Sequence, residues 1–461
     1  MTHGVTRELA RFVARARWED LSVEAIDATK RALLNILGCC VAGVDTRIGR
    51  LHVGLAKEMG ASPAQATILG DGAKVSMPAA AYANGNLAFA LDFEDTVEYV
   101  THPGFVTCAS GLAIAEPMRA SGRDLILAIA LGYEVIARVG LSMQPTPERG
   151  KLVFGEQYHP FGGMVAAGKL LGLDEAQFDA AFGIAGTYAP VPSAYKYFGV
   201  VAETRPMREV KLGWGWMCMG ATLAALSAKR GFGGGHGILD GERGFYVMAG
   251  SDRCDFERIT RGLGEGWRIV DADPKIFPAI ARHAAPYTAT RELVAQHGIA
   301  ANDVARVVVR GLQTRLVDDA DPRSAVDAQF SLPFAVVMAL VDAPLGPEMF
   351  ADATLFDPTV RALLGRVVVE HDADADVLYF EAQRLRYSVR IESKSGAIFT
   401  RDVEFPRDQP HLSQRGLEEK FRTLGGGRLS QAQLSSAIAL VARLDELDDL
   451  GPLVDTLCPT G

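Results

Sequence analysis

Four acidic side chains, two threonines and a histidine lie within one short stretch of the chain, residues 84–104. Asp92, Glu94 and Asp95 stand too close together for ordinary core residues, because burying an unpaired carboxylate is costly. His102 follows them, directly before a Pro-Gly pair. Carboxylates beside a histidine are the groups that general acid–base catalysis uses, so we expect an active site here. The alternative, a solvated acidic helix end followed by a turn with an exposed histidine, stays open from this stretch alone.

The same stretch would place three polar side chains on one face if it were helical. Residues three and four apart are neighbours on a helix, which groups Asp92, Thr96 and Tyr99. Asp92 is therefore a candidate for proton transfer, and Thr96 a candidate for substrate binding.

Two further segments hold polar residues that suit an anionic ligand. His159 lies in QYHPFGG, before a predicted helix of small residues whose N-terminal N–H groups favour anions; the alternative is a histidine that caps its own turn. Lys211 lies in REVKLGWGWMCMG, where the chain turns apolar, and Trp216 follows it as a candidate substrate contact. A lysine there could hold a carboxylate, or act as an acid or base if burial lowers its pKa; it could equally extend to solvent.

Composition excludes several classes of function. The chain has 47 basic and 56 acidic residues, a net charge of −9 and no basic run, so nucleic acid is not an expected partner. The 6 cysteines lack CxxC or Cys/His spacing, which indicates a reducing, cytoplasmic setting and no zinc site. The N-terminus has charges at helical spacing and no apolar signal region, and we expect no apolar stretch long enough to cross a bilayer.

Three glycine-rich segments could suggest nucleotide binding: residues 231–237, 262–267 and 424–428. The first lacks the Lys-Ser/Thr ending of a P-loop, and the other two lack dinucleotide spacing and context. We therefore predict loops and no nucleotide cofactor. His236, in the first segment, is interpreted as an exposed loop histidine.

Apolar periodicity predicts a mainly α-helical protein with a smaller α+β region. Through about residue 260, apolar residues recur at three- and four-residue spacing, and small residues allow close helix packing. The clearest predicted helices cover residues 23–43, 79–92, 123–140 and 166–186. From residue 269, β-branched alternation predicts strands. These strands cover residues 304–312, 365–371, 384–393 and 397–405, with helices at 325–342 and 357–364 between them.

The helical pattern returns from about residue 408, with a predicted helix at 429–447 that Ser430 opens as an N-cap. With 461 residues, 48% of them apolar, the chain is long enough for two domains. We assign residues 1–268 to a large all-α domain and 269–407 to the α+β domain. Residues 408–461 are expected to return to the helical domain.

Several segments, taken in order, resemble the MmgE/PrpD family of dehydratases, decarboxylases and epimerases of small carboxylic acids. The matching segments are NG...LDFEDT...HPG at 84–104, GYEVIARVG at 132–140, YHPFGGMVAAGKLLGLD at 158–174 and KIFP at 275–278. The resemblance implies a helical domain built from both ends of the chain. It also implies a smaller, lid-like α+β domain inserted between them, with the active site between the two.

The same resemblance adds Lys275 to the catalytic candidates, because KIFP matches the family's K-x-[YF]-P segment at the domain junction. The catalytic set is then complete as Asp92, His102, His159, Lys211 and Lys275.

The chain departs from the family pattern at several apolar positions. Phe161 stands where the family has threonine, and Phe334 where it often has tyrosine. His283 stands one residue before a place that several members fill with histidine. Other apolar residues at commonly polar positions are Phe89, Trp214 and Ile280. His283 remains a candidate substrate contact. Because the apolar residues replace hydrogen-bonding groups of the pocket, we expect a substrate with fewer carboxylates or more apolar bulk than a tricarboxylate, whose charges would be poorly matched.

The predicted function is a cofactor-independent lyase that acts on a small hydroxy or unsaturated carboxylic acid. Proton removal or loss of carbon dioxide next to a carboxylate builds negative charge, which Lys275, Lys211 and a histidine would stabilise. Asp92 is the candidate base or base-orienter, and His102 or His159 the proton donor. Dehydration is our first choice; decarboxylation, epimerisation or a binding protein without catalysis are the alternatives. We further expect a cytoplasmic homodimer with no metal and no membrane partner.

Overall fold

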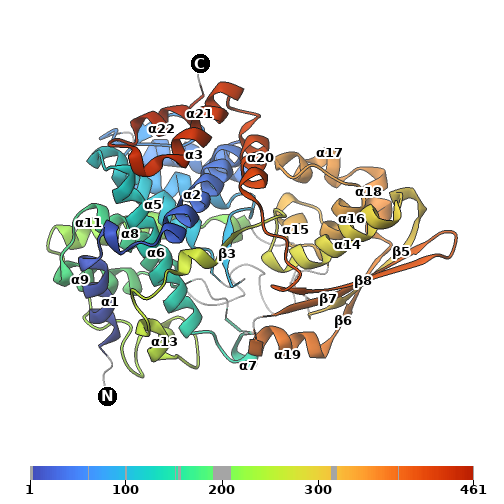
Figure 1. The fold of residues 1–461 in the computed structure, drawn as a ribbon, viewed down its shortest axis with the longest axis horizontal. Helices are drawn as coiled ribbons and strands as arrows, with labels where there is room; N and C mark the ends of the chain where they lie inside the picture. Colours follow the sequence, from blue (N-terminus) through green and yellow to red (C-terminus); the bar gives the residue numbers. More distant parts are fainter. Residues whose placement is uncertain are drawn as a thin grey trace.

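The computed structural model describes residues 4–60, 62–98, 101–150, 152–153, 157–190, 209–312, 319–382 and 384–459. Figure 1 shows a larger helical part that contains both ends of the chain, beside a smaller part with a sheet and helices. Helices dominate and the sheets are small, so the mainly α prediction is confirmed. The division at residues 268 and 407, and a lid-like behaviour of the smaller part, stay predictions.

The helical part is built around helices that are buried on nearly all sides. Its helices are α1 (Val5–Arg15), α2 (Val23–Gly43), α3 (Arg47–Gly60), α4 (Met77–Phe89), α5 (Pro103–Met118), α6 (Gly122–Ser142), α7 (Pro147–Gly150), α8 (His159–Leu170), α9 (Glu175–Thr187), α11 (Gly215–Lys229), α12 (Phe245–Met248) and α13 (Phe256–Thr260). Small residues allow α5, α6 and α8 to pack closely. A Cβ on Gly132 of α6 would lie 2.8 Å from the carbonyl oxygen of Gly162 in α8, so glycine is needed at this crossing.

Helix α6 corrects one expectation from the sequence. Among the described residues it is long and apolar enough to cross a bilayer by length and composition, and α2 with α3 passes the same test as a bent pair. The apolar window of α6 is entirely buried inside the protein, as it is in a core helix.

The smaller part contains a four-stranded sheet in the order β6-β5-β7-β8. The strands are β5 (Val304–Gly311), β6 (Val367–His371), β7 (Leu385–Ser393) and β8 (Ile398–Phe405), which confirms the four predicted strands to within two residues at each end. β5 and β6 run parallel, and the other pairs are antiparallel. The turn between β7 and β8 contains Gly396 at φ 87°, a conformation that glycine adopts without strain.

The helices of this part are α14 (Ala284–His297), α15 (Ala325–Gln329), α16 (Leu332–Leu340), α17 (Asp352–Leu355), α18 (Pro358–Leu364) and α19 (Ala373–Ala382). The single helix predicted at 325–342 is two helices, because Ser331 caps α16 by accepting the Phe334 N–H at 3.1 Å. Figure 1 shows α14 and α16 on one side of the sheet.

The last helices, α20 (Gln414–Gly425), α21 (Gln431–Ala442) and α22 (Gly451–Thr456), pack against the helical part. Figure 1 shows α20 next to α2 and at the border of the two parts. Gly38 of α2 permits this contact, since a Cβ there would lie 3.2 Å from the Phe421 ring. Ser430 caps α21, as its sequence predicted.

Two further helix predictions were wrong in detail. The helix predicted at 166–186 is α8 and α9, separated by Gly172 at φ 63° and restarted by Asp174 as an N-cap. The stretch after α4 is not helical, so Asp92 and Thr96 do not share a helix face. Asp92 has a left-handed backbone at φ 49°, and Thr96 lies in the short strand β3 (Asp95–Val97). Tyr99 lies outside the described residues.

Candidate active site

A short strand pair brings Lys275 beside the acidic stretch. Strand β3 pairs antiparallel with β4 (Ala272–Pro274), which places Asp95 opposite Pro274. The next residue continues this pairing, because the Lys275 N–H donates to the Glu94 carbonyl oxygen at 2.9 Å. Segments almost two hundred positions apart are thereby held in register.

The Lys275 ammonium lies between two buried carboxylates. Its Nζ contacts Asp92 Oδ1, lies 3.0 Å from Glu94 Oε1 and donates to the Asp92 carbonyl oxygen at 3.0 Å. The side chains of all three residues are at most 3% exposed. Burial disfavours the charged lysine, but the Asp92 and Glu94 charges outweigh burial and hold the pKa of Lys275 above its usual value. Lys275 therefore stays an ammonium at neutral pH.

Glu94 also joins Lys275 to a histidine. His102 Nδ1 lies 2.6 Å from the same oxygen, Glu94 Oε1. The other oxygen, Oε2, is buried and has no hydrogen-bond partner among the described residues. An orphaned buried carboxylate oxygen is uncommon in proteins and points to a functional role.

The two predicted histidines meet across a helix-end contact. The backbone N–H of His102 donates to His159 Nε2 at 3.1 Å. His159 Nε2 is therefore the acceptor, and a neutral His159 carries its proton on Nδ1. His102 precedes α5 and His159 begins α8, each followed by proline at the start of its helix. Proline there lacks an N–H that the first turn would leave unpaired.

An aromatic wall, Phe89 with Trp214, borders the histidines. The two rings stack with centroids 3.9 Å apart. The Trp214 ring lies 5.6 Å from the His102 ring and 5.4 Å from the His159 ring. Both wall residues are buried, so this side of the site is apolar and excludes water.

The polar cluster also has the donor types of a metal site. Ligand atoms of Asp92, Glu94 and His102 lie within 4.8 Å of one another, although no ligand spacing in the sequence indicated this. The Lys275 ammonium already contacts both carboxylates, so a positive charge stands where a cation would neutralise them.

The GYEVIARVG segment, in α6, contacts the acidic stretch through Tyr133. Tyr133 donates its hydroxyl to Asp95 Oδ2 at 2.5 Å. Burial raises the pKa of Asp95 to about 7, although the Tyr133 hydrogen bond acts in the opposite direction. Glu134 and Arg138 form a buried ion pair that also binds the backbone of the loop leading to β4.

Thr96 and His283 are buried near the junction of the two parts. Thr96 lies in β3, opposite Asp273 of β4, directly beside the cluster. His283 ends the short turn before α14 and is fully buried. The backbone of Lys211 lies in a short turn of helix at Glu209–Leu212, and its side chain is outside the described residues.

The remaining candidates lie in other surroundings. Phe161 packs against Phe182 and Phe245 in the helical core, and Phe334 stacks near Phe350 in the core of the smaller part. Trp216 is 58% exposed and its ring contacts Tyr82 instead. A substrate contact by any of them stays a prediction, but their packing supplies no support for it.

The sequence analysis assigned no catalytic or binding role to Glu94 or Trp214, although both are central in the structure. Glu94 belonged to the crowded carboxylates, and crowding was the signal that could have found it. Trp214 differs from Trp216 by two positions at the start of α11, and only the packing around the helix decides which of them points inward.

Comparison with known proteins covers almost the whole chain. The model of the MmgE/PrpD N-terminal domain matches residues 7–257, and that of the C-terminal domain matches residues 277–446. The cis-aconitate decarboxylase of Homo sapiens is 26% identical, over 99% of this chain and 95% of the human protein. The enzyme of the same name from Mus musculus is 27% identical over 99% and 94%, and that of Aspergillus terreus (strain NIH 2624 / FGSC A1156) is 25% identical over 99% and 96%. The resemblance seen in the sequence is confirmed.

Proposed function

The chain belongs to the MmgE/PrpD family, and from this premise we propose that it removes carbon dioxide from a small unsaturated carboxylic acid. Its similarity to decarboxylases over the full chain supports a lyase, which confirms the predicted enzyme class. The names of these relatives favour decarboxylation over dehydration, which was our first choice from the sequence.

The observation that carries the proposal is the contact chain from Lys275 through Glu94 to His102. Among the described side chains, two carboxylates, Asp92 and Glu94, contact one ammonium, so a neutral His102 would leave this group with a net negative charge in a buried site. This imbalance, with the contact of His102 Nδ1 to Glu94, supports His102 as the proton donor. Asp92 holds the lysine in place and acts as a positioning group for the acid–base chain.

The reaction needs a carboxylate one carbon away from a C=C bond, with a second carboxylate conjugated to that bond. The C–C bond to the departing carboxylate breaks, and its electron pair forms a new C=C bond. The former alkene pair moves to the carbon next to the second carboxylate, which becomes an enediolate that Lys275 stabilises. His102 then delivers its proton to that carbon, carbon dioxide leaves, and solvent reprotonates His102.

The aromatic wall limits the substrate that fits. Phe89 and Trp214 offer no charge to pair with a carboxylate, so a substrate carboxylate placed there would be buried without a charged partner. An unsaturated dicarboxylate with an apolar substituent suits this site better than cis-aconitate. The Lys275 ammonium supplies the positive charge for the reaction, so the proposed chemistry requires no metal or organic cofactor.

The test is incubation in deuterated buffer with cis-aconitate and with 3-methylglutaconate, which replaces one carboxylate of cis-aconitate by a methyl group. We expect carbon dioxide release, a shifted C=C bond and one deuterium at the protonated carbon by NMR. The saturated analogue tricarballylate should release nothing, and prior dialysis against a strong chelator should leave the rate unchanged. Alkene formation from hydroxy acids without carbon dioxide release would contradict the proposal and restore dehydration. Activity that returns only with added metal would contradict the cofactor-free mechanism.

A further inference from the structure

A lysine from the C-terminal helix α20 binds the backbone of both segments that form the active site. Lys420 Nζ donates to the carbonyl oxygen of Phe93 at 2.7 Å and to that of Lys275 at 2.9 Å. The same nitrogen lies 3.6 Å from the centroid of the Phe93 ring, within range of a cation–π interaction.

These contacts link the two segments that carry the catalytic side chains, residues 92–94 and Lys275. Phe93 stands between Asp92 and Glu94 in the chain, so its carbonyl fixes the backbone from which both carboxylates extend. The Lys275 carbonyl belongs to the residue whose ammonium contacts those carboxylates. One nitrogen of Lys420 thus links the segment of Lys275, the donor in the catalytic contacts, to the segment that carries the acceptors Asp92 and Glu94.

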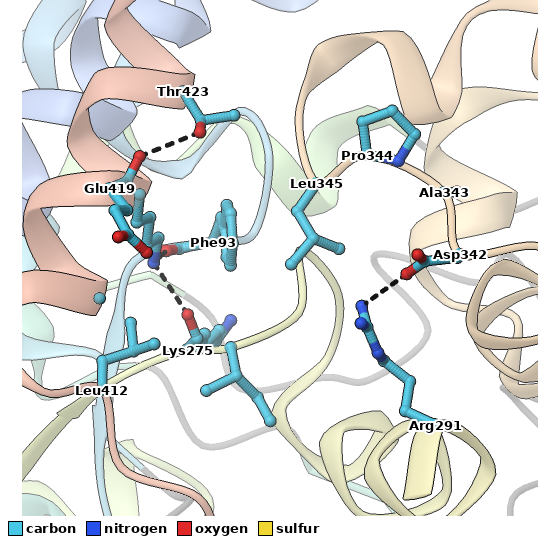
Figure 2. Close-up of a pocket in the computed structure, with 13 residues that line it drawn as sticks. Phe93, Lys275, Arg291, Asp342, Ala343, Pro344, Leu345, Leu412, Glu419 and Thr423 are labelled. Atoms are coloured by element: carbon cyan, nitrogen blue, oxygen red, sulfur yellow. Dashed lines mark hydrogen bonds and ion pairs between the residues drawn. The ribbon is translucent and has the colours of Figure 1, made fainter. Parts of the chain in front are cut away.

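Lys420 reaches this point from outside the polar cluster. It lies on the wall of a cavity of about 410 Å³ between the helical part and the smaller part. Figure 2 shows Phe93, Lys275, Leu412 and Glu419 on one side of this cavity, opposite Leu345 and Asp342. Of the side chains that carry the proposed chemistry, Lys275 is among its lining residues, whereas Asp92, Glu94 and His102 are not.

The sequence of α20 places a cation on an otherwise apolar face. Lys420 lies three and four positions from Leu417 and Leu424, which are buried, and next to the buried Phe421. Burial lowers the pKa of Lys420 to about 8, so the fold keeps an ammonium where burial disfavours its charge. An apolar residue would pack on this face without that cost, which indicates that the hydrogen bonds matter.

We propose that Lys420 is a positioning residue of the active site, which holds the Asp92–Glu94 segment and Lys275 in their reactive register by bridging the Phe93 and Lys275 carbonyls. This inference rests on the proposed function for its kinetic consequence. Lys420 touches no reacting atom in this account and acts only through the residues that it holds.

Lys169 provides a matched control within the same chain. Its Nζ donates to three backbone carbonyls at the end of α1, those of Val13, Ala14 and Ala16, at 2.7 to 3.1 Å. Burial lowers its pKa as well. Lys169 therefore shares the chemistry of Lys420 but binds a part of the helical domain that carries no predicted site residue.

The test compares Lys420→Met with Lys169→Met by steady-state kinetics and thermal unfolding. Misplacing a reacting group by about 1 Å can cost on the order of a hundredfold in rate, so we expect kcat of Lys420→Met to fall about tenfold to a hundredfold, with KM changed less than about threefold. Lys169→Met should lose comparable thermal stability with kcat unchanged.

In Lys420→Ala, propylammonium should restore part of kcat by entering the cavity, whereas propanol should not. A folded Lys420→Met with the wild-type kcat would overturn the proposal, as would an equal loss of kcat in both methionine variants.

A second variant covers the case in which Lys420→Met does not fold. Lys420→Gln keeps a polar group on the cavity wall but is too short to bridge both carbonyls, and it should lose kcat while staying folded; full activity would again overturn the proposal. If the wild-type protein converts no carboxylate, the proposed function fails, and a crystal structure of Lys420→Gln still decides the positioning role. Displacement of Lys275 from Asp92 and Glu94 would support that role, and an unchanged Lys275 would contradict it.

Discussion

Two clusters of buried charged side chains, the Glu134–Arg138 pair in α6 and the Glu94 cluster in the site, differ in how completely their polar atoms are paired. In α6, both Glu134 oxygens accept hydrogen bonds, and Arg138 donates from all three of its nitrogens to Glu134 or to backbone carbonyls. In the site, Glu94 Oε2 has no partner among the described residues, and two carboxylates share one lysine and one histidine. A saturated ion pair fixes structure, whereas an unsaturated and charge-imbalanced cluster can exchange protons with a substrate.

The largest effect on activity should come from Asp92→Asn. The amide keeps the shape of the side chain, and Glu94 still pairs with the Lys275 ammonium, so the loss of stability should be smaller than the about 3–5 kcal/mol that a fully uncompensated buried charge costs. We expect kcat/KM to fall about 10²- to 10⁴-fold, the usual contribution of the acid–base chain that Asp92 positions. Steady-state kinetics and thermal unfolding provide the measurement, and near-wild-type turnover would remove Asp92 from the mechanism.

For the ion pair in α6 we expect the opposite, a loss of stability without a loss of activity. Arg138→Met leaves Glu134 buried and uncompensated, which should lower the free energy of unfolding by about 3–5 kcal/mol. The fraction that remains folded should retain kcat. Urea denaturation with parallel activity assays tests this, and a stable variant without activity would show that the two charged groups do not divide the roles as described.

A smaller effect is expected from the aromatic wall. Trp214→Leu opens space next to His102 and should lower the preference for 3-methylglutaconate over cis-aconitate by about tenfold, since one methyl group contributes about 1–3 kcal/mol of discrimination. Trp216→Leu is the matched control, because this tryptophan is exposed and contacts Tyr82. Equal changes in the ratio of kcat/KM for both variants would exclude Trp214 from substrate choice.

The most gradual effect concerns the pH dependence of stability. Burial raises the pKa of Asp95 to about 7, whereas an unfolded aspartate titrates near pH 4, so between these values the folded state binds more protons. This group therefore favours folding most at low pH and loses that contribution as pH rises toward 7. Asp95→Asn should reduce this decline by at most about 1.4 kcal/mol per pH unit, measured by urea denaturation from about pH 5 to about pH 7. A difference between wild type and variant that stays constant with pH would contradict the assignment.

Local patterns predicted most of the secondary structure. The boundaries of α2 and the four strands of the sheet followed from apolar periodicity and β-branched alternation, which are properties of neighbouring residues. The break between α8 and α9 was missed because Gly172 and Asp174 were treated as interior helix residues.

The site was only partly predictable because its assembly depends on distant contacts. Asp92, His102, His159 and Lys275 were identified from motif residues, but the pairing of β3 with β4 involves three residues on each side and leaves no periodic signal. The roles of Glu94 and Lys420 arise from contacts that this pairing and the packing of α20 create.

The most direct test of the central claim compares Glu94→Gln with Glu134→Gln, which make the same chemical change in the two charged groups. Both variants are measured for kcat with an accepted substrate and for the free energy of unfolding. The account predicts that Glu94→Gln loses at least about a hundredfold in kcat with a small change in stability. It also predicts that Glu134→Gln loses several kcal/mol of stability, about 3 or more, with kcat retained. The same pattern in both variants, or the reverse assignment, would contradict the account.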